Sequence, residues 1–201
     1  MNKVFIGIPT VDGNINAELA MRLIQWSHAY PNIIIHHQPF LIPHDHARNA
    51  LALTFLQSDA THFMGIDADV VPPEDAIDKM LAADKDCITA ITKRFVATAT
   101  GYDLIPTTYM YEHGNYNVCF NHTGQDLVQI DGCGTSCYLA KRKVFEDIKQ
   151  PFKFEYDNNG LVERSEDLYF CTHMMTRGFK LWADYSIDCK HIKQIDISLL
   201  K

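Results

Sequence analysis

Apolar residues in the first half of the chain follow two spacings, and each spacing predicts one kind of element. Short continuous apolar runs are typical of buried strands, and they occupy residues 4–10, 33–35, 63–66 and 87–91. Between the runs, apolar residues recur every three to four positions, which predicts helices over 17–30, 43–57 and 73–83. Strands that alternate with helices predict an α/β domain whose parallel sheet is covered by helices.

The second half of the chain has a different pattern. Residues 95–107 show no clear periodicity and predict a long loop. Short strands are then predicted at 108–112, 117–120, 127–130 and 137–140. A short helix over 142–148 and a longer one over 165–177 precede two closing strands near the end. With 201 residues and no repeat or linker, we expect one domain over residues 1–201.

Composition narrows the class of protein. The apolar fraction of 47% suits a globular core, and the net charge of −7 argues against general binding to a nucleic-acid backbone. No stretch approaches the roughly 18 consecutive apolar residues of a membrane span. The first residues run directly into a predicted strand, without the pattern of a secretory signal. We therefore expect a cytoplasmic protein.

The six cysteines do not form a CxxC pair, and most lie within apolar runs. Buried reduced thiols are the favoured interpretation. Cys133 and Cys137 could form a metal or disulfide pair, but no second pair completes a site. His44 and His46 have the spacing of half a zinc site, and the sequence does not supply the remaining ligands.

Two carboxylates follow the apolar run at 63–66. Because side chains alternate along a strand, Asp67 and Asp69 are expected to point the same way. Two acids on one side repel each other unless a cation lies between them, so a divalent ion that holds a phosphate is the simplest explanation. The alternative is an Asp-rich turn that leads into the helix predicted from Pro73.

Several polar residues are expected to meet at one edge of the sheet. Ligands of parallel α/β sheets bind outside the carboxyl ends of the strands. The residues predicted at those ends are Pro9 and Thr10, Asp67 and Asp69, and Lys93 and Arg94.

The order of the short motifs resembles a known family. Asp67-Ala68-Asp69 is followed by Gly132-Cys133-Gly134, by Glu166-Asp167 and by Lys190-His191. In this order the chain is similar to GT-A-fold glycosyltransferases, most of all to the family 2 group, over residues 3 to 192. The resemblance implies a mostly parallel central sheet flanked by helices, with a small mixed sheet on the acceptor side. It also implies a nucleotide-sugar-binding half over 1–94 and an acceptor-side, catalytic half over 95–201.

The resemblance implies a metal site. Asp67 and Asp69 match the DxD motif, which holds Mn²⁺ or Mg²⁺ against the diphosphate of a nucleotide sugar. His191 lies where some members place a further metal ligand or diphosphate contact. A structural histidine in a strand is the alternative for that residue.

Glu166 and Asp167 match the ED motif of the family. In inverting members the aspartate removes the proton of the acceptor hydroxyl, so Asp167 is the expected general base. The alternative is an ordinary helix opening with Ser165 as its cap.

The resemblance also implies donor contacts. Pro9, Thr10 and Asp12 lie where the family holds the base, and Arg48 lies near the base or a phosphate. Lys93 and Arg94 could reach the donor phosphates. A surface salt bridge is the alternative for Arg48, and charge balance at an acidic rim is the alternative for Lys93 and Arg94.

The expected activity is metal-dependent transfer of a hexose from a nucleotide sugar, UDP- or GDP-linked, to an acceptor hydroxyl with inversion. The acceptor could be a glycan, a lipid-linked sugar, a protein or a modified base. A sugar-nucleotide nucleotidyltransferase is disfavoured, because the segment from Gly7 to Gly13 contains no Lys or Arg to bind a triphosphate. A non-catalytic nucleotide- or carbohydrate-binding module of the same fold is the other alternative.

Overall fold

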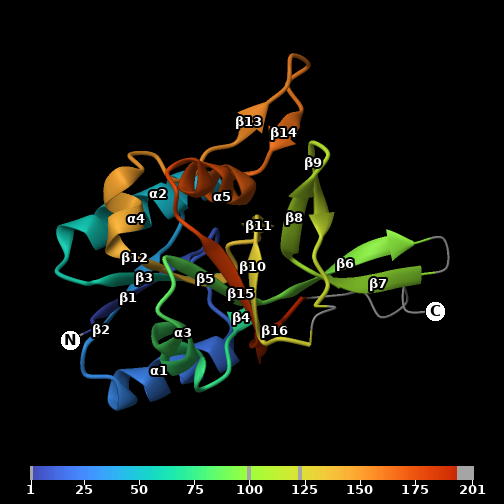
Figure 1. The fold of residues 1–201 in the computed structure, drawn as a ribbon. Coiled ribbons are helices and arrows are strands. Elements are labelled where there is room, and N and C mark those ends of the chain that lie inside the picture. Colours follow the sequence, from blue (N-terminus) through green and yellow to red (C-terminus); the bar gives the residue numbers. More distant parts are fainter. Residues whose placement is uncertain (1, 99–100, 122–123, 194–201) are drawn as a thin grey trace.

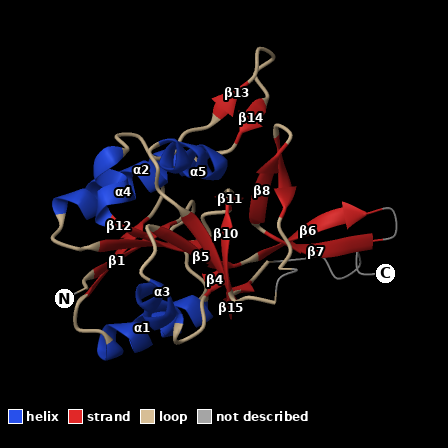
Figure 2. Ribbon diagram, in the orientation of Figure 1, coloured by secondary structure: helices blue, strands red, loops and turns tan. Residues whose placement is uncertain are grey.

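The central feature of the fold is a sheet with helices on both faces (Figures 1 and 2). A computed structural model describes residues 2–98, 101–121 and 124–193. The helices are α1 (Ala17–Ala29), α2 (His44–Gln57), α3 (Ala76–Ala83), α4 (Arg142–Asp147) and α5 (Glu166–Thr176). Helices α1 and α3 cover one face of the sheet, and α2, α4 and α5 cover the other (Figure 2).

The strand order explains how distant segments meet. Neighbouring strands of the main sheet are, in order, β10 (Leu127–Ile130), β15 (Leu181–Asp188), β5 (Cys87–Ile91), β12 (Cys137–Lys141), β3 (His62–Ile66), β1 (Val4–Pro9) and β2 (Ile33–Gln38). Strands β2, β1, β3, β5 and β15 run in one direction, while β12 and β10 run in the other. The predicted α/β class with a mostly parallel sheet is thus confirmed, with β12 inserted between β3 and β5.

Alternation along β1 divides the interior into two cores. Ile6 and Ile8 face α1 and pack in one cluster with Leu19 and Trp26. Phe5 points to the other face, where its ring lies 5.8 Å from that of Phe55 on α2. Burying a large apolar side chain contributes about 1.5–3 kcal/mol, so the sheet is anchored from both faces.

Smaller antiparallel units extend from the main sheet. One has the strand order β11 (Gly132–Cys133), β8 (Thr108–Glu112) and β9 (Asn115–Val118). The two-stranded units are β6 (Lys93–Thr98) with β7 (Gly101–Pro106), β13 (Glu155–Tyr156) with β14 (Val162–Arg164), and β16 (Lys190–His191) with β4 (Val70–Val71). Figure 1 shows the β6–β7 and β13–β14 hairpins projecting from the body of the molecule.

One predicted element was wrong, and one predicted helix begins later than expected. The loop expected over 95–107 contains most of the β6–β7 hairpin, in which Phe95 pairs with Leu104. The helix expected from Pro73 begins at Ala76, because the Pro73 carbonyl accepts from the Ala76 amide in a turn and the Glu74 carbonyl accepts from the Trp26 indole. Among the described residues, the helices are too short or too polar to cross a membrane.

Candidate active site

The carboxyl ends of β1 and β3 open into a pocket of about 360 Å³. Its walls come from the loop after β1, the turn after β3, and the N-terminal parts of α2 and α5. The lining residues are Pro9, Thr10, Val11, Asp12, Asn14, His44, Arg48, Asp67, Ala68, Asp69, Glu166, Asp167 and Lys193. Five carboxylates and two cationic side chains therefore surround this space.

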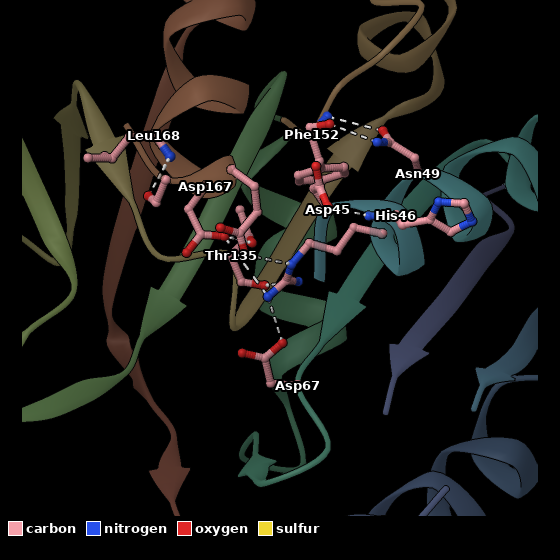
Figure 3. A network of polar contacts seen from close by, with 11 residues as sticks. Asp45, His46, Asn49, Asp67, Thr135, Phe152, Asp167 and Leu168 are labelled. Atoms are coloured by element: carbon pink, nitrogen blue, oxygen red, sulfur yellow. Dashed lines mark hydrogen bonds and ion pairs between the residues drawn. The ribbon is translucent and has the colours of Figure 1, made fainter. Parts of the chain in front are cut away.

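Arg48 contacts acids of both sequence motifs, Asp67-Ala68-Asp69 and Glu166-Asp167. It lies on the inner side of α2, and its side chain is only 8% exposed. One guanidinium nitrogen donates to Asp67 Oδ1 at 2.9 Å, and the other donates to the Thr135 carbonyl at 3.3 Å. Glu166 Oε1 lies 3.7 Å from Nε, and Asp167 Oδ1 lies 4.0 Å from Nη2. Figure 3 shows Asp67, Thr135 and Asp167 grouped around these contacts.

The buried guanidinium is held in its charged form. Burial alone lowers the pKa of Arg48, but the carboxylates of Asp67 and Asp167 raise it further than burial lowers it. The neighbouring Asn49 fixes α2 on the other side, because its amide exchanges hydrogen bonds of 2.7 and 3.1 Å with the Phe152 backbone (Figure 3). Arg48 is thus a buried hub rather than the surface salt bridge of the alternative interpretation.

Glu166 and Asp167 occupy the first turn of α5, which begins after the cap Ser165. Burial, followed by the charge of Asp167, raises the pKa of Glu166 to about 7 against the opposing effect of Arg48. Burial also raises the pKa of Asp167, although Arg48 and the Thr135 hydroxyl act in the other direction. The carboxyl groups of Glu166 and Asp167 can therefore exchange a proton near neutral pH.

Thr135 is a site residue that sequence reasoning missed. Its hydroxyl donates a short hydrogen bond to Asp167 Oδ1, and its carbonyl accepts from Arg48. The preceding Gly134 lies so close to Thr107 that an added Cβ would meet the Thr107 Cβ at 3.2 Å. The Gly132-Cys133-Gly134 turn was the available signal, since glycines allow this close approach.

Asp69 has different partners from Asp67. Its Oδ1 lies 3.5 Å from His191 Nε2, and its Oδ2 accepts from Lys193 Nζ at 2.5 Å. Burial raises the pKa of Asp69, but the contacts with His191 and Lys193 outweigh burial and lower it to about 2. Asp69 is therefore a carboxylate at neutral pH. No sequence pattern indicated Lys193 as a site residue.

His191 is arranged so that one ring nitrogen faces Asp69. Its Nδ1 lies 2.7 Å from the Lys93 carbonyl, which can only accept, so Nδ1 carries the hydrogen. The neutral ring then has its lone pair on Nε2, which is buried and makes no hydrogen bond among the described residues. The contact with Asp69 raises the pKa of His191, as expected for a histidine that pairs with a carboxylate when protonated. In its neutral form, the ring donates through Nδ1 and leaves Nε2 free to bind a metal.

These residues fit a divalent cation in part. Asp69 and His191 offer an oxygen and a nitrogen, a mixed donor set that suits Mn²⁺ somewhat better than Mg²⁺. The predicted third ligand, Asp67, is paired with Arg48. Within residues 2–98, 101–121 and 124–193, no three His, Cys, Asp or Glu side chains are grouped closely enough to hold an ion. The three-residue metal site remains a prediction.

The remaining predicted contacts divide into two groups. Pro9, Thr10 and Asp12 line the pocket, and Asp12 accepts from the amide of Asn14, a lining residue that was not predicted. Lys93 and Arg94 are not among the lining residues and instead begin the exposed hairpin strand β6. The Lys93 side chain pairs with Asp188 at 2.8 Å, while its carbonyl orients His191.

The chain was compared with known proteins. No family model matches it, and no curated protein sequence matches it. Among solved structures, A197 from STIV is similar, with a TM-score of 0.64 and 21% identity, covering 96% of this chain and 86% of that one.

Two further similar structures contain UDP or a UDP-sugar. GalNAc-T7 with UDP, GalNAc and Mn²⁺ has a TM-score of 0.58 and 11% identity, covering 96% of this chain and 44% of that one. TarS 1–349 of S. aureus in complex with UDP-GlcNAc has a TM-score of 0.55 and 10% identity, covering 98% of this chain and 60% of that one. The chain thus spans roughly half the length of these two proteins.

These similarities establish the fold. The chain has the GT-A glycosyltransferase fold, as the motif order predicted. Membership of family 2 does not follow from identities this low.

Proposed function

We propose that this protein is a glycosyltransferase that moves a sugar from a nucleoside diphosphate sugar, a UDP- or GDP-sugar, to an acceptor hydroxyl with the help of Mn²⁺ or Mg²⁺. One observation carries the proposal. The acid pair on α5 and the Asp69–His191 pair line or adjoin one pocket at the carboxyl ends of the parallel strands. This arrangement supports a proton acceptor and an ion-binding pair beside one substrate-sized space.

The charge of the pocket supports a bound cation. Asp12, Asp67, Asp69, Glu166 and Asp167 outnumber Arg48 and Lys193, so a free diphosphate would enter a predominantly negative space. When bound between Asp69 and His191, a divalent ion would neutralise the diphosphate and stabilise it as a leaving group. The ligands of the two similar structures, UDP with Mn²⁺ in one and UDP-GlcNAc in the other, have this chemistry.

The protein's own side chains have separate roles in the proposed reaction. Thr135 and Arg48 hold one oxygen of Asp167, and the carboxylate takes the proton of the acceptor hydroxyl. The acceptor oxygen then forms a bond to the anomeric carbon while the bond from that carbon to the diphosphate breaks. Arg48 also holds Asp67 and Glu166, so it keeps the acidic groups of the two motifs at fixed positions.

Calorimetric titration of UDP in the presence and absence of Mn²⁺ tests the metal-binding part of the proposal. We expect Mn²⁺ to strengthen UDP binding to the wild-type protein by at least about tenfold, a change of about 1.4 kcal/mol. Asp69→Ala and His191→Ala should remove this dependence, because each removes one ligand. Asp188→Asn, an exposed site next to Lys93, is the matched control and should behave as wild type.

An unchanged effect of Mn²⁺ on UDP binding in both the Asp69→Ala and the His191→Ala protein would show that the ion is held elsewhere. The measurement needs no turnover, so it is independent of the acceptor.

A further inference from the structure

A cluster of three tyrosines lies beside the acid pair and has no part in the chemistry described above. Tyr109 and Tyr111 lie two positions apart on β8, so their side chains point to the same face. Tyr116 on β9 is paired with Tyr111. The rings of Tyr111 and Tyr116 are 5.0 Å apart, and those of Tyr109 and Tyr116 are 6.4 Å apart. All three therefore share one face of the hairpin, which we call the tyrosine face.

The tyrosine face is fixed to the helix that carries Asp167. The Tyr116 hydroxyl contacts Thr172 Oγ1 at 2.8 Å, and Thr172 in turn donates to the carbonyl of Leu168. Gly132 lies against both Tyr116 and Leu168, because a Cβ added at Gly132 would lie 2.9 Å from a side-chain atom of each. Leu168 directly follows Asp167, so the tyrosine face adjoins the first turn of α5.

A second connection runs through β11. The Asp131 carboxylate accepts from the Tyr111 amide at 2.9 Å, and the Asp131 amide donates to the Tyr109 carbonyl at 2.9 Å. From Asp131 the chain continues through the glycine turn to Thr135, which holds Asp167. The hairpin and the acid pair are thus parts of one braced unit.

The exposure of the tyrosines differs in a way that suits a ligand. Tyr116 is partly buried against α5, whereas Tyr111 at the outer position is 53% exposed. Tyr116 therefore supports a neighbouring ring that has a free surface. A flat, rigid aromatic surface with a polar edge is suited to stacking against a ring while hydrogen-bonding to its substituents.

We propose that Tyr111, supported by Tyr116, is a stacking platform for a neutral glycan, which makes a glycan the acceptor class. This inference rests on the proposed function for its role as an acceptor site. Asp131 lies beside the platform, since its carboxylate accepts from the Tyr111 amide, and it offers an oxygen acceptor to sugar hydroxyls. The same acid, and the net charge of −7, repel the phosphates of a nucleic acid, which also stacks on aromatic rings.

Saturation-transfer NMR without donor or metal tests the platform. The probes are the neutral disaccharides cellobiose, maltose, mannobiose and chitobiose, with oligouridylate as the competing class. We expect wild-type protein to bind at least one disaccharide and not to bind oligouridylate. Tyr111→Ala and Tyr111→Leu should weaken that binding by about tenfold or more, because both remove the flat ring.

Two variants serve as controls. Tyr111→Phe retains the ring and should bind as wild type. Tyr102→Ala removes a tyrosine of similar exposure, 49%, from the β6–β7 hairpin, and it should also bind as wild type. A thermal melt within a few degrees of wild type for each variant shows that the fold is kept.

Three results would overturn the platform: no disaccharide binding by the wild type, equal binding by Tyr111→Ala, or binding of oligouridylate alone. A separate assay keeps the two proposals apart. Metal-dependent hydrolysis of a UDP-sugar by wild-type protein, measured without any disaccharide, reports on the proposed function alone. If wild-type protein binds the disaccharide but turns over no nucleotide sugar, the proposed function fails while the glycan site stands.

Discussion

Arg48 determines the electrostatics of the candidate site, because one buried cation faces the carboxylates of Asp67, Glu166 and Asp167. One positive charge cannot balance three ionised acids at short range in a largely buried space. Burial, together with the charges of the neighbouring acids, raises the pKa values of Glu166 and Asp167 in spite of Arg48. The sequence motifs predicted Arg48 and the three acids as site residues, but they did not predict that Arg48 contacts all three acids, since this depends on the packing of α2 against α5.

The raised pKa of Glu166 predicts how stability depends on pH. Between its ordinary value of 4.5 and about 7, the folded state keeps a proton that the unfolded state has released. The free energy of unfolding should therefore fall as the pH rises through this window, by on the order of 3 kcal/mol from this group. Glu166→Gln should flatten the fall, as measured by urea unfolding at pH 5 and pH 8.

Glu74→Gln is the control for that experiment, because the Glu74 side chain is 80% exposed. It should show the same change between pH 5 and pH 8 as wild type. A Glu166→Gln protein with the full wild-type pH dependence would mean that Glu166 titrates normally in the folded state.

Removing the charge of Arg48 should destabilise the folded protein. Arg48→Met leaves three carboxylates without their buried partner, and we expect a loss of about 3 kcal/mol in the free energy of unfolding at pH 8. The loss should be smaller at pH 5, where the acids can take up protons. Adding Asp67→Asn to Arg48→Met should recover part of it. A loss below about 1 kcal/mol at pH 8 would contradict the role of Arg48 as the hub.

At the scale of elements, the spacing of apolar residues predicted the helices and strands whose formation depends on neighbouring residues. The apolar runs at β1 and β3 and the helical spacing of α1 are properties of consecutive residues, and each element was confirmed with similar bounds. The insertion of β12 between β3 and β5 depends on residues far apart in the chain. The β6–β7 hairpin was missed because most of its residues are exposed on both faces, so the apolar alternation of a half-buried strand is absent.

The inserted strand imposes a tight contact that can be tested. An added Cβ at Gly65 on β3 would meet the ring of Tyr138 on β12 at 2.3 Å, and that ring is fully buried. Gly65→Ala should lower the free energy of unfolding by about 1–3 kcal/mol, measured in urea. The double variant Gly65→Ala/Tyr138→Leu should cost less than the sum of the single changes, because leucine vacates the space. Additive costs would show that the clash is relieved in another way.

At the scale of the whole molecule, the fold gathers its acids at the edge where the parallel strands end. The braced unit of α5, β11 and the β8–β9 hairpin then places the tyrosine face next to that edge. The sequence motifs predicted that Asp67, Asp69, Glu166 and Asp167 belong to one site, and all four line the same pocket. They did not predict the tyrosine face, since the three tyrosines come together only through strand pairing and have no motif of their own.

The most direct test of the proposed function compares wild-type protein with Asp167→Asn in two assays on the same sample. The first measures Mn²⁺-dependent release of UDP or GDP from a panel of nucleotide sugars, and the second measures binding of the free nucleotide with Mn²⁺. Wild-type protein should release the nucleotide from at least one donor. Asp167→Asn should bind nucleotide within about threefold of wild type and lose at least about 100-fold in release, the usual contribution of a general base. Release by Asp167→Asn at the wild-type rate, or no release by wild-type protein from any donor, would contradict the account.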